Sequence, residues 1–152
     1  MFIDTNLLVL LVVGETDKTM ISKHRRTKAY RVGDYERLVR LINETDHPVF
    51  VTPNTLTEAS NLLAQHGEPE RSRIFDVLQA LIETTEERVI ESKAATRNSH
   101  FKRLGLTDAA LLEVVSASNP LVTVDLDLYL AALAKEAGAA YNFTHYRDFR
   151  PL

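Results

Sequence analysis

Four acids stand where apolar segments of the chain begin or end. Asp4 follows the apolar pair Phe2-Ile3, and Asp125 follows "LVTV". Glu58 and Asp108 lie near the starts of two segments with helical apolar spacing. Carboxylates that share a pocket repel one another, so such a pocket persists when protons or cations neutralise it. Because hard divalent cations prefer oxygen ligands, the set suits Mg²⁺ or Mn²⁺ and phosphodiester hydrolysis by metal-activated water.

Each acid, taken alone, also has a purely structural explanation. Asp4 and Asp125 suit helix N-caps. Asp108 would complement a helix dipole, and Glu58 would pair with a surface cation. The apolar setting of Asp4 and the placement of acids at strand ends favour a shared pocket, since ligands of open parallel sheets bind beyond the carboxyl ends of the strands.

The elements that must position these acids alternate between short strands and longer helices. Apolar runs predict buried strands at 2–3, 48–52, 121–124 and 139–143. Helical spacing and cap residues predict helices at 7–13, 34–42, 53–66, 69–84, 92–104, 108–118 and 126–137. Asp34, Thr52 and Thr107 are the expected N-caps, and Gly67 and Gly138 the expected stops. Residues 14–33 show no apolar period and predict a long loop.

This alternation predicts the α/β class. Strands joined by helices form βαβ units, which build a parallel sheet covered on both faces. We therefore expect a three-layer α/β/α sandwich with a central, mainly parallel sheet. At 152 residues, without a visible linker or repeat, the chain is expected to form one domain over residues 1–152.

Four segments resemble, in the same order, the acidic motifs of PIN domains: "FIDTNLL", "TPNTLTEASNLL", "GLTDAALLEVV" and "LVTVDLDLYL". The resemblance implies a Mg²⁺- or Mn²⁺-dependent endoribonuclease, as in the toxins of bacterial toxin–antitoxin pairs. It makes Asp4, Glu58, Asp108 and Asp125 the catalytic metal ligands, with Asn6 and Thr123 as polar supports. Asp127 is a rival for the fourth acid in "VDLDL", and Asp125 is preferred because it stands nearer the strand end.

The same resemblance names partners: RNA as substrate, an antitoxin protein, and a second copy of the chain. The loop at 14–33 is longer than expected in compact toxins, and its cations include Lys23, Arg25, Arg26 and Lys28. These four could hold RNA backbone, with Tyr30 or Tyr35 stacking on a base, and a solvated loop is the alternative. A second candidate patch comprises Arg97, Lys102 and Arg103, otherwise an ordinary exposed helix face.

Composition excludes several other classes. Because the chain has no cysteine, thiolate zinc sites and iron–sulfur clusters are excluded, and a reducing compartment such as the cytoplasm is expected. The apolar start is too short for a membrane span and lacks the pattern of a secretion signal. The histidines show no paired metal-ligand spacing, and no serine-hydrolase or nucleotide-loop motif is present.

Two other functions stay open from the sequence. Asp125-Leu126-Asp127 after a strand is similar to the nucleophile loop of aspartate-dependent phosphatases, where the first Asp attacks phosphorus and the second protonates the leaving group. A non-catalytic α/β module that binds RNA or protein, or that carries a signal, is the other alternative. Such a module would also have acidic residues at the ends of its strands.

Overall fold

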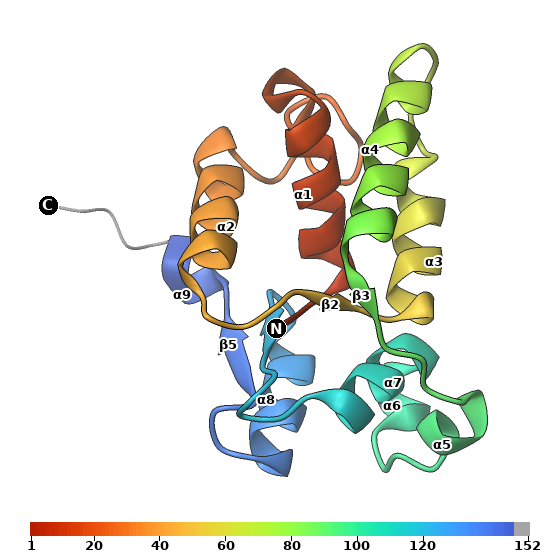
Figure 1. Ribbon diagram of the computed structural model, residues 1–152, viewed down its shortest axis with the longest axis vertical. Coiled ribbons are helices and arrows are strands. Elements are labelled where there is room, and N and C mark those ends of the chain that lie inside the picture. The colour runs from red at the N-terminus through yellow and green to blue at the C-terminus, as the bar shows by residue number, and fades with distance from the viewer. Residues whose placement is uncertain (148–152) are drawn as a thin grey trace, which may run out of the picture.

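Five short parallel strands form the sheet at the centre of the computed structural model, which describes residues 1–147 (Figure 1). In chain order they are β1 (Phe2–Ile3), β2 (Phe50–Val51), β3 (Glu86–Glu87), β4 (Leu121–Thr123) and β5 (Ala140–Asn142). Their order across the sheet is β3-β2-β1-β4-β5, and every pairing is parallel. The predicted α/β class with a parallel central sheet is confirmed.

Helices cover both faces of this sheet and make the three layers. The first layer holds α1 (Thr5–Thr16), α2 (Val32–Glu44), α3 (Pro53–Leu63) and α4 (Glu70–Thr84). The opposite layer holds α5 (Ser92–Thr96), α6 (Phe101–Leu104), α7 (Leu106–Val114) and α8 (Leu126–Lys135), and α9 (Thr144–Arg147) follows β5. Figure 1 shows the two helix groups above and below the strands.

Alternation along the strands explains why both faces are covered. Ile3, Val51 and Val122 pack into the core beneath α1 to α4. Their neighbours Phe2 and Phe50, together with Leu121, belong to the core that α7 and α8 cover. Successive strand residues point to opposite faces, so apolar residues in sequence require a helix layer on each side.

The structure differs from the predicted elements in two places. The strand β3 consists of two exposed glutamates, which carry no apolar signal, and the sequence interpretation missed it. The helix predicted at 92–104 is broken into α5 and α6. Asn98 Oδ1 accepts the His100 backbone N–H at 2.9 Å, and this local turn replaces a helical turn between the two segments.

Several predicted helix ends are also wrong. Asp34 lies inside the first turn of α2, where its carboxylate accepts the Arg31 N–H at 2.8 Å, so Arg31 is the N-cap. Thr107 lies inside α7, which begins after Gly105. The helix α3 ends at Leu63, before the expected stop at Gly67, and α8 ends at Lys135. Side-chain oxygens near a helix start suit several first-turn positions, which explains the shifts of two or three residues at the starts of α2 and α7.

The predicted loop at 14–33 is shorter and more ordered than expected. The helix α1 continues to Thr16, and a 3₁₀ turn, η1 (Lys18–Met20), follows it. Met20 and Ile21 are buried in the main core, which anchors the segment that carries the basic residues. Within residues 1–147 no helix has the length and apolar character needed to cross a bilayer.

We predict that Gly14→Ala destabilises the protein. An Ala Cβ at this position in α1 would lie 2.2 Å from Cδ2 of the buried Tyr35 ring. The Tyr35 hydroxyl donates to Glu15 Oε2 at 2.7 Å, which restrains the ring. Overpacking typically costs about 1–3 kcal/mol, which outweighs the roughly 1 kcal/mol of better helix propensity.

Urea unfolding measures this prediction, and Gly33→Ala is its control. Gly33 lies in α2, and an added Cβ there would meet nothing within 4 Å. We expect the control to unfold at the same or a higher urea concentration than the wild type. Equal stability of the two variants would contradict the role given to the Gly14–Tyr35 contact.

Candidate metal centre at the carboxyl edge of the sheet

Asp4 is the buried member of the acidic set and is also the N-cap of α1. Its side chain is 4% exposed. Oδ1 accepts the Leu7 N–H at 2.9 Å, while Oδ2 accepts the Thr123 hydroxyl and the Val124 N–H, the latter at 3.0 Å. Burial raises the pKa of Asp4 against the lowering effect of these hydrogen bonds, and the nearby Asp125 raises it further. The hydrogen bonds of the Asp4 carboxylate therefore connect the end of β1 to the end of β4.

Thr123 connects two of the acids. Its hydroxyl donates to Asp4 and accepts the backbone N–H of Asp125 at 3.0 Å. Asp125 in turn caps α8, since its Oδ1 accepts the Leu128 N–H at 3.0 Å. The hydroxyl therefore fixes the first acid and the backbone of the last acid in one arrangement.

Replacing Thr123 by Val is expected to weaken both the fold and metal binding. Val keeps the shape but removes the hydroxyl that donates to the buried Asp4 carboxylate, and leaving a buried polar group without its partner costs about 1–3 kcal/mol. A lost hydrogen bond to a metal ligand typically lowers metal affinity about 10–100-fold. Thermal unfolding and Mn²⁺ titration measure the two effects. Thr123→Ser, which keeps the hydroxyl, should behave as wild type, and loss of affinity in both variants would argue against the hydroxyl's role.

Glu58 reaches the same region from the middle of α3. Its Oε1 accepts the Thr107 hydroxyl of α7 at 2.7 Å, and its Oε2 accepts the Thr5 hydroxyl of α1 at 3.2 Å. One carboxylate therefore lies between the first turns of the helices that carry Asp4 and Asp108. The sequence interpretation missed both threonines as partners of Glu58. Their adjacency to Asp4 and Asp108 in the sequence was the only signal for them.

Asp108 carries the clearest electrostatic sign that the four acids converge. Burial raises its pKa to about 7, with further contributions from Asp125, Glu58 and Asp4 in that order. All three other members of the set therefore lie close enough to oppose its ionisation. Among the ion pairs of the described residues, none involves these four carboxylates. Within residues 1–147 the acidic set therefore gathers negative charge that no ion pair balances.

The donor set fits a hard divalent cation. All four groups are carboxylates, which Mg²⁺ and Mn²⁺ prefer, and the cation would relieve the repulsion that raises the pKa of Asp108. As they stand, the described side chains form no cluster of three or more His, Cys, Asp or Glu that could already hold an ion. Hydrogen bonds from Leu7, Thr107 and Leu128 direct carboxylate oxygens toward the protein. Mg²⁺ often binds through one or two carboxylates and several waters, so it does not require a complete protein cage.

The remaining predicted site residues lie in different surroundings. Asn6 is exposed in the first turn of α1. Asp127 lies in the first turn of α8, but its Oδ1 pairs with Arg103 Nη1 at 3.5 Å. The pKa perturbations of Asp4 and Asp108 both involve Asp125, and neither involves Asp127. Of the two acids, it is therefore Asp125 whose charge acts on Asp4 and Asp108.

The basic loop lies at the other end of α1 from Asp4. The helix has 12 residues, which corresponds to a length of about 18 Å. Lys23, Arg25, Arg26 and Lys28 are all exposed. Arg26 Nε donates to Gln65 Oε1 at 2.7 Å, beyond the end of α3. The loop is thus not beside the acids, and RNA would have to run along α1 and α3 to contact both.

A buried histidine anchors this loop, and Tyr35 is not free to stack on a base. His24 is fully buried, its Nδ1 accepts the Arg26 N–H at 3.0 Å, and its ring stacks on His66. Tyr35 is buried and bonded to Glu15, so its expected role in base stacking is wrong. Tyr30 is partly buried against the main core.

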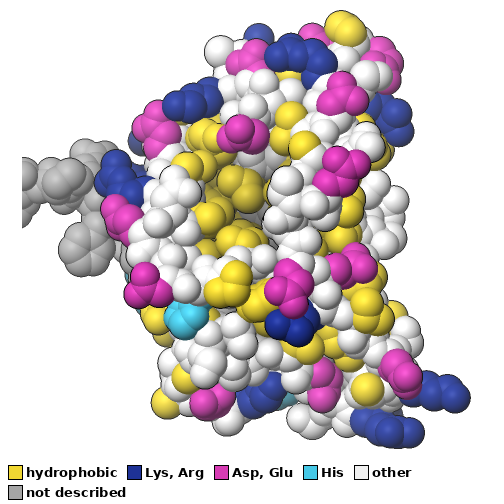
Figure 2. Space-filling model, in the orientation of Figure 1, with side chains coloured by type: hydrophobic (Ala, Val, Ile, Leu, Met, Phe, Trp, Pro, Cys, Tyr) yellow, Lys and Arg dark blue, Asp and Glu magenta, His cyan; other side chains and the backbone are white. Residues whose placement is uncertain are grey.

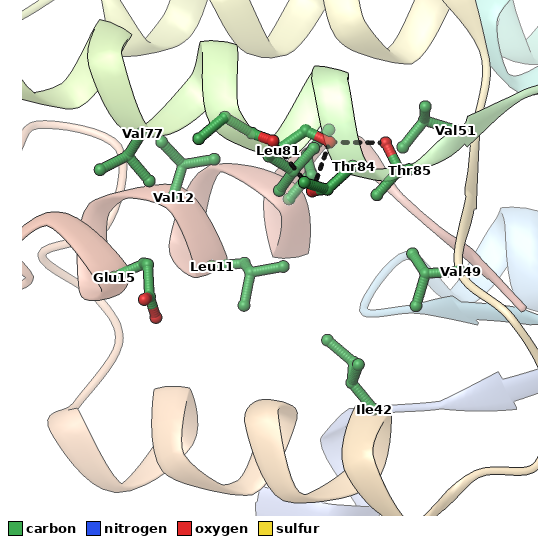
Figure 3. Close-up of a pocket in the computed structure, with 12 residues that line it drawn as sticks. Leu11, Val12, Glu15, Ile42, Val49, Val51, Val77, Leu81, Thr84 and Thr85 are labelled. Carbon is green, nitrogen blue, oxygen red and sulfur yellow. Dashed lines mark hydrogen bonds between the residues drawn. The ribbon is translucent and has the colours of Figure 1, made fainter.

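A separate apolar cavity of about 450 Å³ lies between α1, α2 and α4. Figure 2 shows hydrophobic side chains in this hollow, with charged side chains around it. Figure 3 shows Leu11, Ile42 and Val77 around the opening. The Thr84 and Thr85 hydroxyls of its wall donate to backbone carbonyls of α4. The cavity includes none of the four acids, so any chemistry of the acidic set takes place elsewhere.

Comparisons with known proteins give no relative from which a function could be transferred: no family model, no curated protein and no solved structure matches this chain. The functional argument therefore depends on the geometry and electrostatics of the site.

Proposed function

We propose that the protein is a Mg²⁺- or Mn²⁺-dependent endoribonuclease of the PIN type. The observation that supports the proposal is the convergence of Asp4, Glu58 and Asp125 on Asp108, whose pKa is raised to about 7 by burial and then by these three acids. Among residues 1–147, no cation forms an ion pair with any of the four. The order of the four acidic motifs along the chain supports the same proposal.

The four acids would hold the metal at the carboxyl edge of the sheet. When bound, the metal supplies a hydroxide from water near neutral pH and neutralises charge on the phosphate. Thr123 holds the Asp4 carboxylate in place, while Thr5 and Thr107 hold Glu58. Asp108 must lose its proton for full ligand strength, so we expect activity to rise with pH through about 7.

The contacts of the "VDLDL" segment support a hydrolytic metal site over an aspartyl-phosphatase site. A phosphatase would need Asp125 as nucleophile and Asp127 as proton donor. Asp127 instead forms an exposed ion pair with Arg103, while Asp125 is the acid of this segment that raises the pKa values of Asp4 and Asp108. Trapping of a phosphorylated Asp125 would reverse this preference.

Cleavage of single-stranded RNA of random sequence tests the proposal. Purified protein should cut it with Mn²⁺ or Mg²⁺ and not with EDTA. Because the nucleophile is water, 2′-O-methyl substitution at the cut position should still allow cleavage. Failure to cut with either metal would contradict the proposal, and cleavage that requires the 2′-hydroxyl would contradict its mechanism.

Toxin status, an antitoxin partner, a homodimer and a cytoplasmic location follow as proposals from the resemblance to PIN toxins. The adjacent reading frame provides a direct test of the partner. Co-expression of its product should suppress the RNA cleavage and yield a complex that copurifies. Cleavage that is unchanged by this product would contradict the toxin proposal but leave the nuclease proposal intact.

A further inference from the structure

Arg103 is a cation on α6 that forms an ion pair with the first turn of α8. It lies on α6, which leads through Gly105 directly into α7 and Asp108. Its Nη1 lies 3.5 Å from Asp127 Oδ1 in the first turn of α8, and its Nη2 lies 3.1 Å from His100 Nδ1. Asp127 is two residues beyond Asp125. The guanidinium therefore lies between α6 and the first turn of α8, the helix that Asp125 caps.

This ion pair has little value for stability. The side chains of Arg103 and Asp127 are 52% and 70% exposed. Exposed pairs contribute about 0–1 kcal/mol in typical proteins, and screening by salt lowers this further. Among the ion pairs of residues 1–147, this is the only one that brings a cation into the first turn of α8. The pair therefore leaves the Arg103 guanidinium exposed and oriented toward the helix that Asp125 caps.

We propose that Arg103 binds a phosphate of the RNA backbone next to the phosphate that is cleaved, and that Asp127 and His100 position its guanidinium. This inference rests on the proposed nuclease function. Four neighbouring carboxylates repel a polyanion, so a substrate strand needs a cation just outside the metal site. A guanidinium has five N–H donors in a planar fork, so it contacts Asp127 and His100 and still offers donors to phosphate oxygens.

The proposal also separates the roles of the two acids in "VDLDL". Asp125 belongs to the acidic set, while Asp127 acts through Arg103 and is a positioning residue. Loss of Asp127 should therefore change KM and leave kcat within a few-fold. A metal ligand would show the opposite pattern, with the main loss in kcat.

Binding of single-stranded RNA tests the proposal without relying on catalysis. The assay uses a fluorescent RNA of random sequence and proteins that all carry Asp125→Asn, so that cleavage does not interfere. Arg103→Ala should weaken binding about fivefold, as expected for one exposed charge contact. It should also reduce the slope of log K against log salt by about 0.7, the value for one phosphate on a single strand.

Two variants make the test specific. Lys93→Ala removes one exposed charge from the neighbouring helix α5, and we expect unchanged affinity and salt slope. Arg103→Lys keeps the charge without the planar fork, so it should restore the salt slope but only part of the affinity. An unchanged slope in Arg103→Ala, or an equal loss in Lys93→Ala, would overturn the proposal.

A double-mutant cycle in the active protein tests the positioning by Asp127. If Asp127 acts through Arg103, Asp127→Asn should raise KM in the wild type and add little in the Arg103→Ala variant. Additive effects would overturn this role. RNA binding that depends on Arg103 in a protein that never cuts RNA would support the phosphate contact while the nuclease proposal fails. Cleavage without dependence on Arg103 would overturn only the present inference.

Discussion

Asp108→Asn should make the metal-free protein more stable at pH 8, by about 1–2 kcal/mol. The pKa of Asp108 is raised to about 7 by burial and by Asp125, Glu58 and Asp4. The full shift corresponds to about 4 kcal/mol, and the partial exposure of the side chain lowers the expected effect. Asn removes the charge that these neighbours oppose.

The direction with pH follows from proton linkage. Between the ordinary pKa of 3.8 and the folded pKa of about 7, the folded state holds a proton that the unfolded state has lost. The contribution of Asp108 to the stability of the wild type therefore falls as pH rises through that window. This contribution is fully lost above about pH 7. The variant lacks this fall, so the two proteins should differ most at pH 8 and least near pH 4. Urea unfolding at both pH values measures the difference.

Bound Mn²⁺ should make the wild type more stable than Asp108→Asn. A ligand that binds only the folded state at 100 times its Kd stabilises that state by about 2.7 kcal/mol. We expect Mn²⁺ to raise the Tm of the wild type more strongly at pH 8 than at pH 5.5, and to raise that of Asp108→Asn much less. Equal shifts in both proteins would show that Asp108 takes no part in the metal site.

Asp125→Asn should lower kcat for RNA cleavage on the order of 10³-fold, because a lost ligand removes several kcal/mol of transition-state stabilisation. Asn is as good an N-cap as Asp, so its side-chain oxygen can still accept the Leu128 N–H of α8. The variant should therefore fold normally. Single-turnover cleavage with Mn²⁺ measures the loss in the chemical step.

Asp127→Asn is the matched control for this loss. It makes the same chemical change two residues away, on a side chain that pairs with Arg103 at the surface. We expect kcat to stay within a few-fold of the wild type, since no ligand is lost. The assignment of the fourth acid would be reversed if Asp127→Asn abolished cleavage and Asp125→Asn did not.

The sequence was informative where local chemistry decides the structure. Three patterns predicted β1, the start of α3 and β4 to within one residue: the apolar pair before Asp4, the Thr52-Pro53 helix start and "LVTV" before Asp125. Each signal is a short-range pattern of burial or capping. The candidate acids could be found in this way because they stand next to such patterns.

Features that depend on contacts between distant residues could not be predicted from the sequence. The strand β3 exists because two exposed glutamates pair with Phe50 and Val51, not because of its own composition. The distance of the basic loop from Asp4 follows from the whole length of α1. The pairing of Arg103 with Asp127 likewise requires α6 and α8 to meet. Tertiary packing decides these features.

The most direct measurement of the central claim is cleavage of RNA by the wild type and by Asp108→Asn, each with Mn²⁺, Mg²⁺ and EDTA. Asp108 is a better choice than Asp4, where the amide of Asn would face the Val124 N–H that now donates to Oδ2. We predict metal-dependent cutting by the wild type and none by the variant, although the variant is the more stable protein without metal. Equal cutting by both proteins would contradict the claim that the converging acids form the catalytic metal site.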